Sequence, residues 1–65
     1  MDIYSEKGTK VVYMGCSDEQ LKWGGSDDPR QILIPGAVYA VDYIWYNIVV
    51  LEEYPDKIFN TVFFD

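Results

Sequence analysis

The residues that could do chemistry in this chain of 65 residues are few, because it has no histidine and a single cysteine. This excludes zinc sites of the usual cysteine and histidine type, and nucleophiles activated by a neighbouring histidine. Asp27 and Asp28 are adjacent carboxylates, but the spacing of a calcium-binding loop is absent. Glu52 and Glu53 are neighbours on an expected strand, so they point to opposite faces and cannot form a glycosidase pair. We therefore expect no enzymatic activity and no cofactor, and we assign no metal site, although Asp27 and Asp28 could join other carboxylates around Ca²⁺ or Mg²⁺.

Cys16 precedes an expected helix start, where the pKa of a thiol can be depressed. We favour the alternative, a partly buried thiol that fills space, because free cysteine is among the most buried residue types. A lone cysteine also fits a reducing compartment. No apolar run approaches the roughly 20 residues that span a bilayer, and no basic signal region opens the sequence. We expect a cytoplasmic protein that does not bind membranes.

Large aromatic side chains occur at expected helix ends and turns, where complete burial is difficult. If two or three of them lie together beside carboxylates, they form an aromatic patch with a polar rim that binds a protein partner. The alternative, that they cover the open ends of a small barrel, has equal weight, since tryptophan is rarely buried completely even in a structural role. These candidate partner-binding residues are Trp23, Trp45, Tyr46 and Tyr54.

The longest polar stretch is residues 24–30, with the sequence GGSDDPR. Loops of this kind often carry the function of a small scaffold, which makes Asp27, Asp28 and Arg30 candidate recognition residues. A solvated connector is the favoured alternative, because clusters of glycine, aspartate and proline are typical of simple turns.

Five basic and eleven acidic side chains give a formal net charge of −6. This charge opposes binding to phosphate backbones, so we do not expect a nucleic-acid partner. The favoured role of the acidity is solubility. Mimicry of nucleic acid is the alternative, but the acidic side chains of the second half are too few for a long row of phosphate substitutes.

Residues 34–65 carry the clearest strand pattern. Pro35 and Gly36 occupy the second and third positions of a type II turn, and a strand begins at Ala37. From there Tyr39, Val41 and Tyr43 alternate onto one face. The pattern then predicts a bend at Tyr46–Asn47 in which Asn47 can adopt the left-handed conformation, a strand at 48–53, a type I turn at Tyr54–Lys57 and a last strand at 60–64.

The first half is expected to contain one strand and one short helix. Residues 10–14, KVVYM, are β-branched or aromatic in the main and predict the strand. Ser17 and Gln20 have the spacing of a capping box, which predicts one or two helical turns, and Gly24 is expected to end them. Residues 1–9 are expected to fray.

The pattern predicts a mainly all-β domain covering residues 1–65, in which about five short antiparallel strands close as a small SH3-like β-barrel. Large aromatic side chains allow so short a chain to close a core. Unpaired sheet edges make a homodimer plausible. The expected core is Val11, Tyr13, Leu21, Leu33, Tyr39, Val41, Val49, Leu51, Phe59, Val62 and Phe64.

A resemblance to known proteins covers about residues 10–64. It is carried by Tyr13 with Gln20 and by four motifs: WGxxDDPR at 23–30, PGxxYxV at 35–41, LEEYP at 51–55 and FNTVFF at 59–64. Together they resemble a group of short uncharacterised proteins of bacteriophages and prophages, which is similar to small SH3-like β-barrels. The resemblance implies this fold and a phage setting, with no settled activity. It also implies that Trp23 packs on the barrel while Asp27, Asp28 and Arg30 hold their loop through local hydrogen bonds and charge pairs. Family members often carry a histidine near the tip after the GxxYxV strand, and residues 42–47 have none.

The favoured function is a non-enzymatic, protein-binding accessory factor of phage or prophage origin in the cytoplasm of a bacterial host. It would bind a host or phage protein and inhibit or modulate a defence or nucleic-acid-processing protein. The alternatives are a self-associating structural or virion-associated module, and a barrel that binds nucleic acid or a small ligand.

Overall fold

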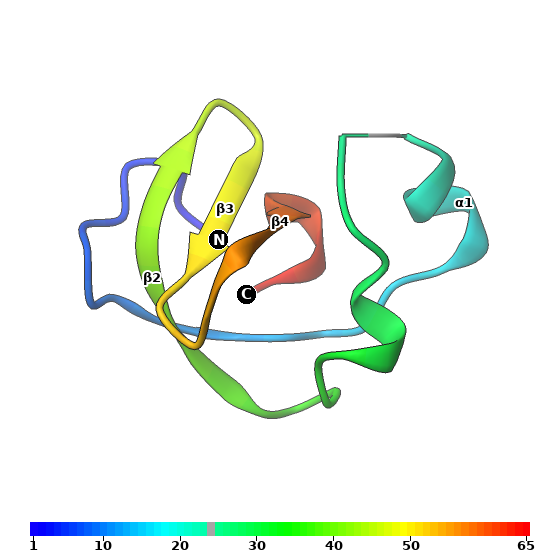
Figure 1. Ribbon diagram of the computed structural model, residues 1–65, viewed down its shortest axis with the longest axis horizontal. Coiled ribbons are helices and arrows are strands. Elements are labelled where there is room, and N and C mark those ends of the chain that lie inside the picture. The colour runs from blue at the N-terminus through cyan, green and yellow to red at the C-terminus, as the bar shows by residue number, and fades with distance from the viewer. Residues whose placement is uncertain (24) are drawn as a thin grey trace.

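A computed structural model of the chain describes residues 1–23 and 25–65. In these residues four antiparallel strands form one open sheet in the order β1-β2-β3-β4, and there is little helix (Figure 1). The mainly-β prediction is confirmed, with four strands in place of the expected five. The elements are β1 (Lys10–Val12), α1 (Asp18–Lys22), η1 (Pro29–Gln31), β2 (Val38–Trp45), β3 (Ile48–Leu51), β4 (Tyr54–Asn60) and η2 (Thr61–Phe63), where η denotes a 3-10 helix.

The connection from β1 to β2 contains the two features that its sequence predicts most strongly. Ser17 and Gln20 form the capping box of α1: each side-chain oxygen accepts a hydrogen bond from the other residue's backbone N–H, at 3.0 and 3.1 Å. Gly36 has a φ of +87°, and the N–H of Ala37 donates to the carbonyl of Ile34 at 3.0 Å, which closes the predicted turn. The predicted helix end at Gly24 lies outside the described residues.

The β2–β3 hairpin bends at Tyr46, which has a φ of +56°. No other described residue except glycine has a positive φ, so Asn47 does not adopt the left-handed conformation expected of it. Within β2 the register shifts between Val41 and Tyr43. Val41 therefore lies in the core while Tyr43 is exposed, although simple alternation predicts that they share a face.

The predicted turn at Tyr54–Lys57 is wrong, because these residues belong to β4. The chain reverses just before the predicted turn, at Glu52 and Glu53, and Leu51 pairs with Tyr54 across the hairpin. Pro55 is tolerated in β4 because this strand is at the edge of the sheet, where a missing N–H need not break a ladder.

The predicted last strand at 60–64 is replaced by η2. The side chain of Asn60 caps this turn by accepting a hydrogen bond from the N–H of Val62 at 3.0 Å. The helical turn breaks the strand alternation, so Phe63 is buried and Val62 is exposed. Beyond η2, Asp65 exchanges two backbone hydrogen bonds with Val12, at 2.9 and 3.1 Å.

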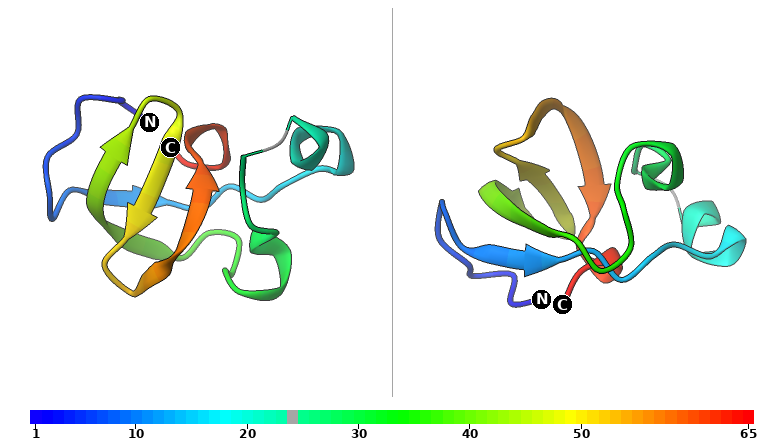
Figure 2. Two further views of the ribbon diagram at one scale, coloured as in Figure 1. Left: turned by 45° about the horizontal axis from the view of Figure 1, so that its top comes forward. Right: turned by 90° about the horizontal axis from the view of Figure 1, so that it is seen from below.

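The two ends of the chain lie side by side next to β1 (Figure 2). The amino group of Met1 donates to the carbonyl of Phe64 at 3.0 Å. Fraying is expected for residues 1–9, and at the other end of this segment the N–H of Gly8 donates to the carbonyl of Val41 in β2 at 2.7 Å.

The core fills the concave side of the sheet. All the predicted core residues belong to it except Leu21, which is half-buried, and Val62, which Phe63 replaces. Tyr13 and Phe59 both pack against Phe64, with ring centroids 5.9 and 6.3 Å from it. The core residues are Val11, Tyr13, Leu33, Tyr39, Val41, Val49, Leu51, Phe59, Phe63 and Phe64.

Candidate functional site

Residues 25–28 run along the free edge of β4 and are bonded to it. The backbone N–H of Asp27 donates to the carbonyl of Ile58 at 2.8 Å, and the N–H of Ile58 donates to the Asp27 carboxylate at 2.9 Å. The N–H of Asn60 donates to the hydroxyl of Ser26 at 3.2 Å. Asp27 and Ser26 therefore act as partners of the strand edge, a role that local sequence patterns do not reveal.

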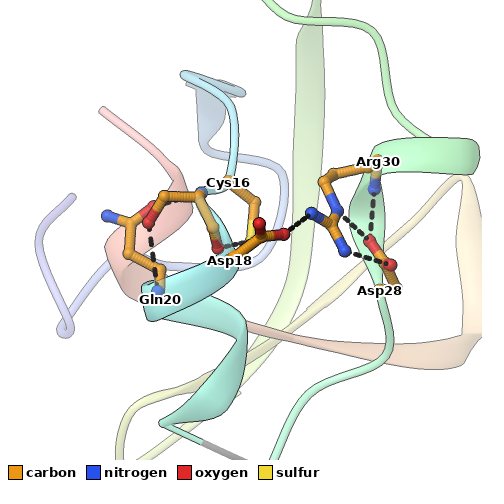
Figure 3. A network of polar contacts seen from close by, with 6 residues as sticks. Cys16, Asp18, Gln20, Asp28 and Arg30 are labelled. Carbon is orange, nitrogen blue, oxygen red and sulfur yellow. Dashed lines mark hydrogen bonds and ion pairs between the residues drawn. The ribbon is translucent and has the colours of Figure 1, made fainter.

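Asp28 and Arg30 make the local charge pairs that the resemblance implies (Figure 3). Asp28 caps η1 by accepting a hydrogen bond from the backbone N–H of Arg30 at 3.0 Å. Its carboxylate also accepts hydrogen bonds from the guanidinium of Arg30, from Nε at 3.0 Å and from Nη2 at 2.9 Å. The side-chain hydrogen bonds from Arg30, followed by the backbone one, hold the pKa of Asp28 below its ordinary value. Arg30 also pairs with Asp18, which ties η1 to the start of α1.

Cys16 lies beside this cluster. Its Sγ donates to the carbonyl of Ser17 at 3.3 Å, and the residue is half-buried. Burial raises the pKa of the Cys16 thiol, so the depressed pKa considered from its position before a helix is not found. The space-filling alternative fits this environment.

The structure separates the four candidate aromatic residues. Tyr54 is half-buried against Tyr39, with ring centroids 6.3 Å apart, so it supports the core. Trp23 follows α1 and is 62% exposed. The resemblance implies that Trp23 packs on the barrel, but most of its surface faces solvent instead. Trp45 and Tyr46 lie together at the end of β2.

Trp45 and Tyr46 form an exposed pair of rings. Their centroids are 5.1 Å apart with an interplanar angle of 65°, an edge-to-face arrangement. Trp45 is 67% exposed and Tyr46 is 77% exposed. The rings contact each other while most of their surface faces solvent.

The side of the sheet opposite the core extends this pair into a larger apolar surface. Trp45 is the cross-strand partner of Ile48, and Tyr43 is that of Val50. Val49 points into the core, so the neighbouring half-buried Ile48 points away from it, and the exposed Ile58 alternates in the same way with buried Phe59. Val50 is itself buried, with 2% of its surface exposed, and is not part of the exposed surface. We call this surface the aromatic face and define it as Tyr43, Trp45, Tyr46, Ile48 and Ile58.

Sequence reasoning found only Trp45 and Tyr46 of this face. The register shift that turns Tyr43 outward leaves no local signal in the sequence. Ile58 was missed because a turn was predicted at Tyr54–Lys57. A strand in its place would have put Ile58 and the buried Phe59 on opposite faces of the sheet.

The segment that supplies most of the aromatic face carries acidic side chains and no basic ones. From Gln31 to Asp56 inclusive, the chain has four carboxylates and no basic side chain. Two of them, Glu52 and Glu53, lie in the β3–β4 turn, at the end of β3 away from Trp45. A third, Asp42, is paired with Lys7 at 2.7 Å. The Asp27 carboxylate borders the face through its hydrogen bond to Ile58, and Gly25 lies beside Ile48.

Within residues 1–23 and 25–65 we find no pocket and no group of three or more side chains that could hold a metal ion. No helix in this part of the chain is long and apolar enough to cross a bilayer. Comparisons with models of known families, with curated proteins and with solved structures gave no match.

Proposed function

We propose that this chain is a non-enzymatic, protein-binding module that uses its aromatic face to contact a partner. The exposed Trp45–Tyr46 pair carries the proposal. A partner that covers these apolar rings would gain about 25 cal/mol of binding free energy for each Å² of apolar surface removed from water. Tryptophan and tyrosine are also enriched among the residues that contribute most to protein interfaces.

The fold that we propose for the module is an SH3-like barrel. Two features support it: η2 separates β4 from the C-terminal residues, and those residues then bond to the chain around β1. Tyr13 and Phe64 form an isolated bridge beside the two Val12–Asp65 hydrogen bonds. Counted as a short fifth strand, this pairing joins the first and last members of the sheet, which is how a barrel removes its edges.

The phage or prophage origin is part of the same proposal, and the resemblance of WGxxDDPR and FNTVFF supports it. A phage-encoded binding module in the cytoplasm of a bacterium would take a host or phage protein as its partner. The proposed effect is inhibition or modulation of that protein by occupation of its surface.

The test is capture of partners from a bacterial lysate by the wild-type chain and two matched variants. Trp45→Ser removes one ring of the aromatic face, whereas Trp23→Ser removes a tryptophan of similar exposure that follows α1. We expect a specific protein to be retained by the wild type and by Trp23→Ser, and lost with Trp45→Ser. Unfolding curves would establish that both variants fold. Capture that is the same for all three proteins would contradict the proposal.

A further inference from the structure

We infer that the aromatic face binds a cationic protein segment, in which arginine or lysine side chains lie on the rings of Trp45 and Tyr46. This inference rests on the proposed protein-binding function and adds the chemistry of the partner. It follows from two independent properties, the geometry of the rings and the net negative charge of the chain.

The rings are arranged to receive a cation. In an edge-to-face pair, the ring that presents its edge keeps both of its π faces free of its partner. Trp45 and Tyr46 are 67% and 77% exposed, so π faces are open to solvent. A guanidinium or ammonium group is attracted to such a face, and tryptophan is the strongest acceptor among the aromatic side chains.

The net charge of the chain favours the same kind of partner. The chain has a net charge of −6, and no basic residue lies between Gln31 and Asp56, the segment that contains Tyr43, Trp45 and Tyr46. Lys7 is already paired with Asp42. Lys57 is half-buried and neighbours Ile58 in β4, where alternation directs it to the opposite face. Within residues 1–23 and 25–65, the aromatic contact of each of these rings is with the other ring and not with a basic side chain, while the net negative charge attracts a cation from outside.

The same charge argues against two other occupants. A second copy of the chain would bring another net charge of −6 and the same rings without a cation. A nucleic acid would bring phosphates into a negative field. A basic segment of another protein is the occupant whose binding is favoured both by apolar contact with the rings and by attraction to the negative charge of this chain.

The experiment is a selection of random linear peptides displayed on phage, with the wild-type chain, Trp45→Ser and Trp23→Ser immobilised in parallel. We expect the wild type and Trp23→Ser to enrich peptides that contain arginine or lysine, and Trp45→Ser to enrich none of them. For an enriched peptide made synthetically, replacing its key arginine with the neutral isostere citrulline should weaken binding by about two- to thirtyfold, the range for one cation–π contact. Added salt should weaken binding further.

The outcomes separate this inference from the proposed function. Enrichment of neutral or acidic peptides that still depends on Trp45 would overturn the cationic partner while keeping the aromatic face as a binding site. If citrulline peptides bind as tightly as arginine peptides, the cationic partner is likewise overturned and the aromatic face is kept as a binding site. Failure of the wild type to enrich any peptide over Trp45→Ser would overturn both.

Discussion

The carboxylate of Glu53 takes the place of a backbone carbonyl beside β2. Both of its oxygens accept from the N–H of Ala40 at 3.1 Å, next to the point where the register between β2 and β3 shifts. Ala40 is buried, so this N–H has little access to water once the carboxylate is removed. Glu53 thus satisfies a donor that the strand pairing leaves free.

We expect Glu53→Ala to lower the free energy of unfolding by about 1–3 kcal/mol, the cost of leaving a buried donor without a partner. Glu53→Gln keeps one acceptor oxygen and should lose less. Urea denaturation measures both. The control is Glu52→Ala, which removes the same charge from the same turn. If Glu52→Ala costs as much as Glu53→Ala, the hydrogen bond to Ala40 is not the cause.

Asp28 makes the stability of the protein depend on pH in a defined direction. Its pKa in the folded chain lies below the ordinary value of 3.8, chiefly because of the side-chain hydrogen bonds from Arg30. A depressed carboxyl pKa stabilises the fold fully above the ordinary value, and this contribution disappears as the pH falls through the folded value.

Asp28→Asn isolates this effect, because asparagine can still cap η1 but carries no charge. We expect the wild type to be the more stable protein near pH 7, and the difference to shrink as the pH falls below 3.8 and through the lower folded pKa of Asp28. Urea midpoints measured at a series of pH values would show the convergence. A difference that stays constant over the whole pH range would rule out the charge pair with Arg30 as its source.

At the scale of the elements, the β2–β3 hairpin combines backbone strain with exposed rings. A residue with a β-carbon pays about 1–2 kcal/mol in the left-handed region, and Tyr46 lies there with a φ of +56°. Glycine or asparagine would relieve the strain. Strain that is kept at an exposed aromatic residue is consistent with a binding role for that residue.

Tyr46→Gly should therefore make the protein more stable and a poorer binder. We expect the free energy of unfolding to rise by about 0.5–1 kcal/mol, because relief of strain exceeds the entropy cost of glycine. Capture of the partner should fall at the same time. Tyr43→Gly is the matched control, since it lies within β2, where glycine should lower stability. A loss of stability in Tyr46→Gly would show that its ring contacts outweigh the strain.

The elements with local signals could be predicted from the sequence. The capping box at Ser17 and Gln20 and the turn at Pro35–Gly36 each depend on residues that are close in the chain, and both are present. The turn predicted at Pro55 failed because a proline and an aspartate also fit an edge strand, and edge position is a property of the whole sheet.

The candidate site was less predictable because it depends on distant contacts. Asp27 was identified as a candidate recognition residue, but its partner, Ile58, lies 31 residues further along the chain. Phe63 lies in the core where Val62 was predicted, and the cause is more local: the side chain of Asn60 caps η2. Asparagine is a favoured cap residue, so this signal was available in the sequence.

At the scale of the whole molecule, the net charge of −6 works against the compact state through self-repulsion. Two of the ion pairs, Lys7–Asp42 and Arg30–Asp18, join separate segments but are partly exposed, so they offset little of it.

We therefore expect the thermal midpoint to rise as sodium chloride increases from about 10 mM to about 0.5 M, because salt screens the repulsion. Differential scanning calorimetry would measure the change. Glu6→Lys makes the net charge less negative by two units at an exposed position, and should reduce the salt effect. A midpoint that falls with salt would mean that the ion pairs dominate.

The bonding of Ser26 and Asp27 to β4 limits how this molecule can assemble. These two residues already occupy the outward N–H groups of Ile58 and Asn60, so that stretch of the strand cannot template a foreign strand. Growth into filaments by strand addition there would first require the loop to leave. The protein in effect terminates its own sheet with a length of irregular chain.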